Sequence, residues 1–434
     1  MADSGPLTTP LTPDSRHRVQ RREIHDFAAG VLFAALLVVA NLLLEHTSFG
    51  EMLEQWGDEM VQSSLPAPAD PGVVVLNISD LPSKSKNEGG EQVRITSRAA
   101  LTRLIDALAK LQPTVIGVDI DLSPRHGAYA SPDDDPKFFE DLLRTRQTSN
   151  VPIYVGAYTS LSMPHELWLG ASRYAPLAAS VALFHGDNRT VPATIGSGRD
   201  AGPTMSEAIA SSAAAPDRPD GISGWLARKE SAWHHRGFTG EEFVVNYGAI
   251  REMRQATFEA IAPSDVANQY ERLHNHAVIL ADTTAGKATD ICEVPRGVLG
   301  TDEDVIPCGY VHASAAFTLI QAPLYRMTLL GRVLWDLAIA VVIFGSVALL
   351  RLYYARSAAK IAAERLYALG FVAFTLVLVL VCVIFVRQTH IVWDDFVLIA
   401  IVLLFHTSIE RRATAFWSWF RNSLPSLVFE RRAE

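Results

Sequence analysis

The sequence predicts an α/β domain with a mainly parallel sheet, joined to four transmembrane α-helices. Two observations lead to this fold class. Apolar runs long enough to cross a bilayer are confined to the two ends of the 434-residue chain. Between them, short apolar runs typical of buried strands alternate with segments whose leucines recur at helical spacing. That alternation is typical of an α/β fold with a parallel sheet.

Four apolar segments have the length of membrane spans, because a bilayer core of about 30 Å needs roughly 20 mostly apolar helical residues. The predicted transmembrane helices are 27–44, 333–350, 367–386 and 391–409. The first run could instead be the core of a secretory signal peptide. However, it follows a polar leader of 26 residues, and no small-x-small cleavage site comes after it. We therefore interpret it as an uncleaved anchor.

Lys and Arg cluster beside these spans on what would be one side of the membrane. Basic residues precede the first span, fill the loop between the second and third, and follow the fourth. Cytoplasmic loops are enriched in Lys and Arg. We therefore expect 1–26 to be a disordered cytoplasmic tail, 410–434 a second cytoplasmic tail, and 45–326 an extracytoplasmic domain. This arrangement describes a multi-pass protein of the plasma membrane.

The charges divide unequally between these regions. The chain has a net charge of −9, and residues 45–326 hold 23 Lys and Arg against 36 Asp and Glu, a net of −13. Nucleic acids and anionic lipid surfaces are bound by basic faces. The acidic domain is therefore expected to bind neither, although an acidic surface that keeps an exported domain soluble explains the same charge.

The middle of the chain predicts strands and helices in alternation. In chain order they are a strand at 73–78, a helix from a Thr96 or Ser97 cap up to Pro113, a strand at 115–120, a helix at 136–148, strands at 153–157, 242–246 and 277–280, and a helix at 311–322. The first strand–helix–strand unit, of about 48 residues, predicts a parallel pair joined by a right-handed crossover. Residues 160–240 are rich in Gly, Pro and Ser and show no regular pattern.

The predicted extracytoplasmic domain contains two of the three cysteines, Cys292 and Cys308. An oxidising compartment permits a disulfide between them, and closing such a loop would add on the order of 3 kcal/mol. Two buried free thiols are the alternative. Two sulfurs alone do not favour a metal site, and the histidine pairs of the chain lack a third ligand at convincing spacing. We expect no metal and no cofactor.

Several local patterns occur in the order found in the bacterial CHASE2 extracellular sensor domain. They are Val73–Ile78 followed by Ser79 and Asp80, Ser97–Leu111 leading into Val115–Asp121, Val244–Tyr247, Ala277–Asp282 with Asp290 and Pro295 downstream, and Gly309–Ala313. With one span before the domain and three after it, the chain resembles that family over about residues 27–407. Ala281 stands where the family usually has glycine. The resemblance implies a bacterial inner-membrane sensor that binds a small ligand or a periplasmic partner.

Asp119 and Asp121 are the most suggestive pair of side chains. They lie two residues apart at a strand end and would point to the same face. In open α/β sheets, ligands gather at the carboxyl ends of the strands. We interpret the pair as a polar or cation-binding edge, with helix capping and solvated loop ends as the alternative. The matched patterns add Asp282, Asp290 and His312 to the candidate ligand-binding residues, although a capping or core histidine is the favoured interpretation of His312.

The same two aspartates also resemble the first motif of haloacid-dehalogenase-type phosphohydrolases. In that motif the first aspartate is a nucleophile and the second a general acid or base. Such enzymes also need a lysine and an acidic Mg²⁺ pair, and Asp282, Lys287 and Asp290 fit these roles only poorly. Because the motif does not occupy the first strand, an exported Mg-dependent phosphohydrolase is the weakest of three hypotheses, and we expect no enzyme.

The leading hypothesis is a membrane-anchored sensor without a fused effector. It would detect an unknown extracytoplasmic ligand and relay the change through its spans in the lipid bilayer, with the helix 311–322 leading directly into span two. The output would belong to a separate cytoplasmic signalling protein, and the sensor could act as a homodimer. The second hypothesis is a membrane scaffold or assembly subunit that senses nothing.

Overall fold

The structure is a computed structural model in which part of the chain is described. The described residues are 47, 52, 56–57, 59–62, 64–88, 91–122, 134–157, 173–181, 189–195, 202–213, 242–284, 290–295, 298, 305–326, 333–339, 341–342, 377, 380–381, 384 and 391–392. The chain divides into two compact units, one of which comprises Asp58–Arg326 and Val383–Val392. Every sheet and helix labelled below belongs to that unit.

The predicted tails and the span 27–44 lie outside the described residues, and the other predicted spans lie outside them in large part. Within the described part of the chain, no helix combines the length and the hydropathy that crossing a membrane requires. The four spans therefore remain a prediction. Residues 333–339 and 341–342, inside the second predicted span, are helical.

A six-stranded sheet forms the centre of the domain, and each pair of neighbouring strands in it is parallel. Its strands, in spatial order, are β11 (Phe258–Glu259), β1 (Val73–Asn77), β12 (Ala277–Ala281), β4 (Val115–Asp121), β5 (Ile153–Ala157) and β6 (Ala178–Ser180). The predicted α/β class with a mainly parallel sheet is confirmed.

The expected pairing of the first two predicted strands is wrong. β1 and β4 are parallel but not adjacent, because β12 lies between them and pairs with both. A strand–helix–strand connection is long enough to pass over one position in the sheet. β12 is buried at every residue and therefore takes a central place.

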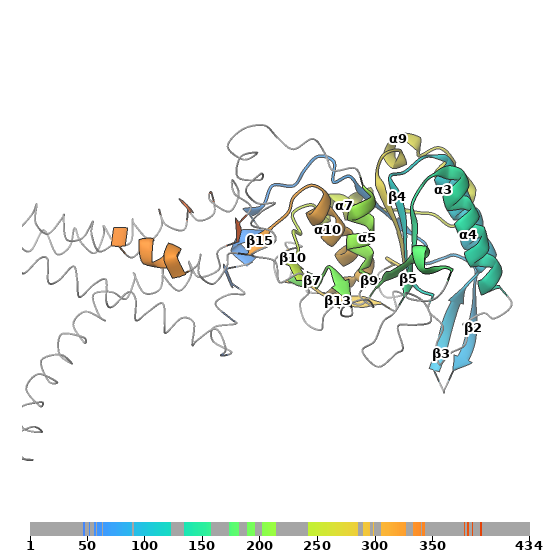
Figure 1. Cartoon of the computed structure of the whole chain (residues 1–434), viewed down its shortest axis with the longest axis horizontal. Helices are drawn as coiled ribbons and strands as arrows, with labels where there is room; N and C mark the ends of the chain where they lie inside the picture. The colour runs from blue at the N-terminus through green and yellow to red at the C-terminus, as the bar shows by residue number, and fades with distance from the viewer. Residues whose placement is uncertain are drawn as a thin grey trace, which may run out of the picture. The chain divides into compact units, whose positions relative to one another are not determined.

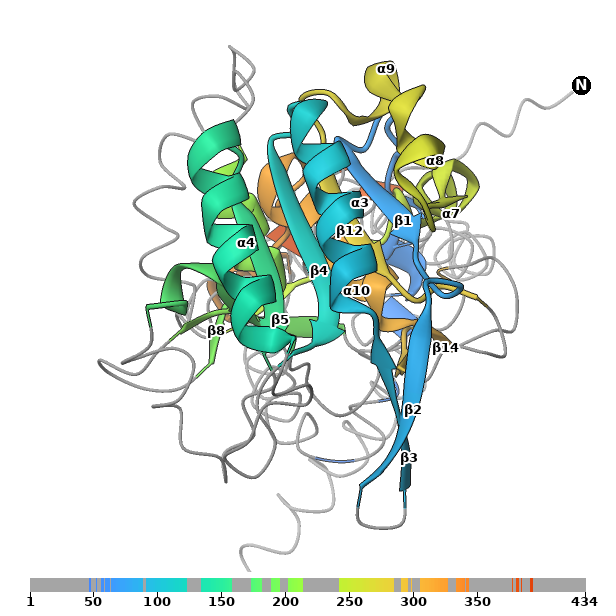
Figure 2. The same cartoon turned by 90° about the vertical axis from the view of Figure 1, so that its right-hand side faces the viewer.

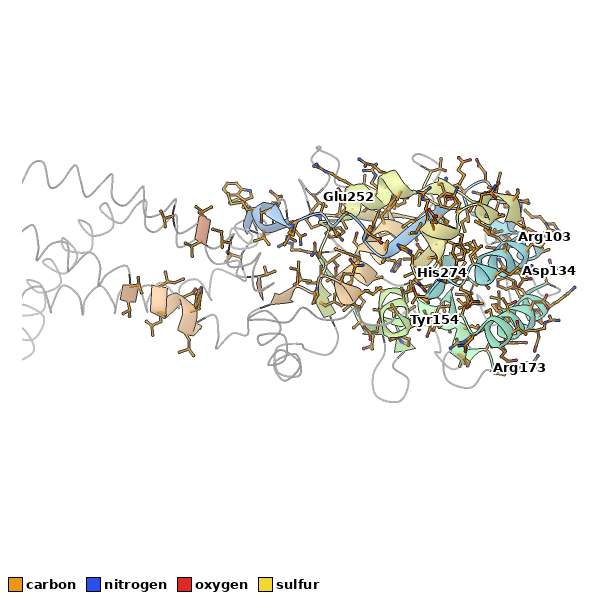
Figure 3. The ribbon with its side chains drawn as sticks, turned by 90° about the horizontal axis from the view of Figure 1, so that it is seen from above. Arg103, Asp134, Tyr154, Arg173, Glu252 and His274 are labelled. Carbon is orange, nitrogen blue, oxygen red and sulfur yellow. A yellow bond between two sulfur atoms is a disulfide. The ribbon has the colours of Figure 1, made fainter. Side chains whose placement is uncertain are left out.

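Helices cover both faces of the sheet (Figure 1). On one face lie α3 (Arg98–Lys110), α4 (Asp135–Ser149), α8 (Pro263–Ala267) and α9 (Tyr270–Leu273), and on the other α5 (Met205–Ser212), α7 (Ile250–Ala256) and α10 (Cys308–Ile320). Figure 3 shows Arg103 and Asp134 on the outer side of α3 and α4, away from the sheet. Ser97 caps α3 as predicted, accepting a hydrogen bond from the Ala100 backbone N–H.

The alternation of side chains along β1 explains the two hydrophobic cores. Val74 and Leu76 face the α3 side, whereas Val73 and Val75 face the α10 side. Because both faces are buried, a parallel strand is apolar throughout, and this is why its sequence shows no alternation of polar and apolar residues.

Short two-stranded pairs surround the sheet. They are the hairpin of β2 (Ser83–Glu88) and β3 (Glu91–Thr96), the pair of β7 (Thr190–Pro192) and β10 (Glu242–Val244), the pair of β8 (Thr194–Ile195) and β9 (Gly202–Pro203), the pair of β13 (Ile291–Glu293) and β14 (Val305–Pro307), and the pair of β15 (Tyr325–Arg326) and β16 (Ile391–Val392). Figures 1 and 2 both show the β2–β3 hairpin projecting from the body of the domain.

Two predicted elements need correction. The strand predicted at 242–246 is the shorter β10, which lies outside the central sheet and pairs antiparallel with β7. The helix predicted at 311–322 is α10, which begins and ends earlier and is followed by β15, so it does not lead directly into span two. Pro323 accounts for the early end, because the residue before a proline is disfavoured in the helical conformation.

Candidate functional site

The candidate site lies at the carboxyl ends of three adjacent strands, β1, β12 and β4. Asn77 ends β1, Asp282 directly follows β12, and Asp119 lies near the end of β4. Since β12 is in register with both neighbours, these ends meet at one edge of the sheet. The helix α10 begins at the same edge and contacts both β1 and β12. Parallel α/β sheets bind their ligands at this edge.

Asp119 and His312 form a buried pair. The His312 Nε2 lies 3.6 Å from the Asp119 Oδ1, and the two side chains are 0% and 3% exposed. The Asp119 Oδ1 and both His312 ring nitrogens make no hydrogen bond of good geometry within the described part of the chain, and the one weak polar contact of the imidazole is with the Val181 backbone. Buried polar atoms are nearly always paired, so this pair is the main chemical anomaly of the domain.

Gly309 permits the close approach of α10 that brings His312 to Asp119. A Cβ at position 309 would lie 2.3 Å from the Ala281 Cβ and 3.2 Å from the Asp119 Oδ2. Atoms that close clash, so position 309 has room only for glycine. The family resemblance expects glycine at position 281 as well. Here the methyl group of Ala281 fills the remaining space between α10 and β12.

Burial moves the pKa values of the two partners in opposite directions. It raises the pKa of Asp119 to about 7, because the charged carboxylate is poorly solvated. It lowers the pKa of His312 to about 4, against the opposing effects of the Asp290 carboxylate and the Val181 backbone. Between these two pH values the pair therefore holds one proton, on Asp119, and carries no net charge.

A second polar cluster lies beside the pair and joins β1 to β12. The Ser79 hydroxyl contacts the Asn77 Oδ1 and the Asp282 Oδ1. The Asn77 side chain also accepts from the Thr283 backbone N–H at 3.2 Å and donates to the Thr284 hydroxyl at 3.0 Å. The chain segments that leave the two strands are thereby held together.

Arg94 connects this cluster to the projecting hairpin. Its guanidinium lies 3.7 Å from the Asp282 carboxylate and donates to the Ser79 and Leu81 backbone carbonyls. Arg94 and Asp282 are partly exposed, at 38% and 24%. Solvent therefore reaches the cluster from the β3 side, whereas it does not reach the Asp119–His312 pair.

A disulfide between Cys292 and Cys308 fixes the start of α10. The two Cα atoms lie 5.0 Å apart. The Asp290 backbone carbonyl accepts a hydrogen bond from the Cys308 N–H at 3.1 Å. Asp290, Cys292 and Cys308 form the one group of potential metal ligands close enough together among the described residues. Since the two sulfurs are bonded to each other, they offer no thiolate to a metal.

The candidate residues predicted from the sequence occupy one region, but not one cluster. Asp119 and His312 are paired, Asp282 belongs to the Ser79 cluster, and Asp290 is exposed beside the disulfide. The pairing of β4 with β5 shifts register between Val118 and Asp121. This irregularity interrupts the alternation of side chains from which Asp119 and Asp121 would be expected to point to the same face. The Asp121 side chain itself is outside the described residues.

Sequence reasoning missed Asn77, Ser79 and Arg94. Asn77 ends an apolar strand and Ser79 follows it, at a spacing that turn residues commonly have, so they carry no distinctive signal. Arg94 alternates with Val93 and Ile95 in β3, a pattern that predicts a strand but says nothing of the role of Arg94, which depends on tertiary contacts alone.

Comparison with known proteins identifies the family of this domain. The profile of the CHASE2 domain matches residues 29–352. No curated protein matches the chain, and no solved structure does. The matched region covers more than half of the sequence and includes the central sheet, the Asp119–His312 pair and α10. The chain therefore belongs to the CHASE2 family, whose domains are of an extracellular sensor type.

Proposed function

We propose that this protein is a membrane-anchored sensor whose domain lies outside the cytoplasm and whose output belongs to a separate cytoplasmic protein. One observation carries the proposal. The helix α10 holds Gly309 and His312 against the carboxyl ends of the sheet and ends at Ile320, shortly before the second predicted span. A helix of this length is about 20 Å long. A shift of α10 at the site would therefore be carried along the helix to the chain segment that precedes this span.

Signal detection of this kind needs two arrangements of α10 that a ligand distinguishes. In the described arrangement the buried pair has three polar atoms without a hydrogen bond of good geometry, which costs free energy. An arrangement in which a ligand, a partner or water reaches these atoms would satisfy them. The two arrangements would then differ in the contacts between α10 and the β4 and β12 strands.

Apolar residues in the predicted spans support membrane anchoring. Val377, Leu380, Val381 and Ile384 are each about half exposed and recur at helical spacing within the third predicted span. Leu334 and Val342 are exposed in the second. Large apolar side chains that point away from their own chain need an apolar environment, and lipid or a second copy of the chain would provide one.

The phosphohydrolase hypothesis receives little support from the geometry of the site. A nucleophilic aspartate must reach its substrate as a carboxylate. The Asp119 side chain is 3% exposed, faces α10, and has a pKa raised by burial. We therefore propose no enzymatic activity. The scaffold hypothesis differs from the sensor in one respect, since it requires no communication between the site and the spans.

Topology is tested first, with one added cysteine in the full chain after replacement of Cys382 by alanine, while Cys292 and Cys308 stay bonded to each other. Ser85→Cys lies on the exposed hairpin, and Ser357→Cys lies in the loop between predicted spans two and three. In intact spheroplasts, a membrane-impermeant maleimide should label the Ser85→Cys variant and leave the Ser357→Cys variant unlabelled until the membrane is permeabilised. The reverse pattern would place the domain in the cytoplasm and end the proposal.

Relay from the site to the spans is tested by disulfide crosslinking between copies through Leu334→Cys. In native membranes, His312→Ala should change the yield of crosslinked dimer, because it removes the imidazole through which α10 contacts Asp119. Leu142→Ala removes an equally buried side chain from α4 on the opposite face and serves as the control. Equal yields for both variants and the parent would support the scaffold and refute the sensor.

A further inference from the structure

One short segment after β10 holds together the parts of the domain that lead to the predicted spans. Gln62 follows the first predicted span, and its side chain bridges two backbone groups of this segment. Its Nε2 donates to the Val245 carbonyl at 2.7 Å, and its Oε1 accepts from the Tyr247 N–H at 3.1 Å. Gln62 is 6% exposed. Because both the donor and the acceptor of this buried amide are hydrogen-bonded, Gln62 fixes the chain that follows span one to the segment after β10.

The same segment fixes the end of α10. The Asn246 backbone N–H donates to the Thr318 hydroxyl at 2.7 Å, and the Asn246 side-chain amide donates to the Ala322 carbonyl at 3.2 Å. The Asn246 Oδ1 accepts from the Gly248 N–H at 2.8 Å, so the orientation of its amide is determined. Asn246 is 3% exposed.

Two further strands extend this arrangement to the last predicted spans. Val244 pairs with Leu324 in an antiparallel bridge, directly before β15. β15 then pairs in parallel with β16, with Tyr325 opposite Ile391 and Arg326 opposite Val392. Val392 is 3% exposed. Residues 391 and 392 open the fourth predicted span, directly after the short loop that follows span three. The structure places them in a strand of the domain instead.

We name the assembly of Val244–Gly248, Leu324–Arg326 and Ile391–Val392 the collar. We propose that the collar, and not α10 alone, couples the domain to the predicted spans, so that a movement of α10 reaches the segments beside spans one, two and four together. This inference rests on the proposed function. It follows from the hydrogen bonds, because Asn246 receives the end of α10 while Gln62, Leu324 and β16 attach to its neighbours.

The first test examines the register of β15 and β16 in the full chain. Neighbouring parallel strands lie about 4.8 Å apart, which is within the Cα separation of about 4.4–6.8 Å that disulfides span. Tyr325→Cys with Ile391→Cys should therefore crosslink within one chain under mild oxidation, in the background without Cys382. Tyr325→Cys with Val392→Cys is the control, because these two positions are not opposite each other in the register of β15 and β16. Equal crosslinking of the two pairs, or of neither, would overturn the collar.

The second test examines transmission through the collar. Asn246→Asp keeps the acceptor for Gly248 and removes the donor to Ala322, and Gln62→Glu likewise keeps the acceptor for Tyr247 and removes the donor to Val245. Each should abolish the difference that His312→Ala makes to crosslinking through Leu334→Cys. A difference that persists in both variants would remove the collar as the route.

The outcomes separate the collar from the sensor. If His312→Ala never changes crosslinking through Leu334→Cys, the sensor proposal fails, while the register test still decides whether the collar exists. Correct pairing of Cys292 with Cys308 in each variant is checked first, because the disulfide protects both sulfurs from maleimide in unreduced protein. If Asn246→Asp or Gln62→Glu leaves these thiols free to react, only the other of the two variants is used.

Discussion

Replacing either member of the Asp119–His312 pair should reveal a pH dependence of stability that the two residues cancel in the wild-type protein. Folding raises the pKa of Asp119 from 3.8 to about 7. Between these pH values the folded state holds a proton that the unfolded state has released. The contribution of Asp119 to stability is therefore complete below pH 3.8 and is lost as the pH rises to about 7. At 1.36 kcal/mol for each pKa unit, the loss is about 4 kcal/mol.

His312 acts in the opposite direction. Folding lowers its pKa from 6.5 to about 4, so the unfolded state holds the extra proton between these values. Its contribution to stability rises with pH over that range, by about 3 kcal/mol. From about pH 4 to 6.5, each state of the wild-type protein holds one proton on these two residues, and the two slopes offset each other.

The two single variants are therefore expected to diverge. Relative to wild type, Asp119→Asn should gain about 4 kcal/mol in its free energy of unfolding between about pH 4 and 7. His312→Gln should lose about 3 kcal/mol between about pH 4 and 6.5. Each partner is neutral while the other titrates, so removing one leaves the charge that the other experiences unchanged.

The assay is urea unfolding of the full chain in a mild non-ionic detergent, followed by intrinsic fluorescence at a series of pH values. Wild type and variants are compared at the same pH, which removes the contributions of all other titrating groups. An unchanged slope with denaturant shows that the same surface unfolds. Variant curves that run parallel to wild type, or that change in the same direction, would refute the assigned protonation states.

Two substitutions and one chemical treatment give further predictions, each measured as unfolding at constant pH. Gly309→Ala should destabilise the domain by about 1–3 kcal/mol, because the added methyl group would lie 2.3 Å from a carbon on β12; an unchanged midpoint would mean that α10 moves freely. Arg98→Met should cost about 3–5 kcal/mol by removing the guanidinium that pairs with the buried Asp135 carboxylate, and adding Asp135→Asn should recover part of this loss. Reducing the Cys292–Cys308 bond should cost about 3 kcal/mol, and a smaller effect would show that the reduced loop stays ordered.

Sequence patterns predict the elements of this domain better than their pairing. The apolar residues of Val115 to Ile120 predict a buried strand, as expected for a sheet covered on both faces, and the structure has β4 there. The strand that pairs with β4 could not be predicted in the same way. Strand β12 is distant from β4 in the sequence. Its position in the sheet depends on which apolar strands must pair with a neighbour on both sides. No local pattern contains that information.

The candidate site shows the same limit. Asp119 and His312 stand out because a carboxylate at a strand end and a histidine in an apolar helix are unusual. Their pairing depends on Gly309, whose missing side chain lets α10 approach β12. Ser79 and Arg94 act through tertiary contacts, so their residue types alone could not reveal them.

The late position of β12 in the chain has a consequence for biosynthesis. Residues 277–281 occupy the slot between β1 and β4, which are both made far earlier. While the ribosome produces the intervening residues, we expect the edges of β1 and β4 that later pair with β12 to be unpaired. Such edges readily join foreign strands, and contacts distant in sequence form slowly. A chain of this design depends on protection of its nascent N-terminal half until the last strand of the central sheet arrives.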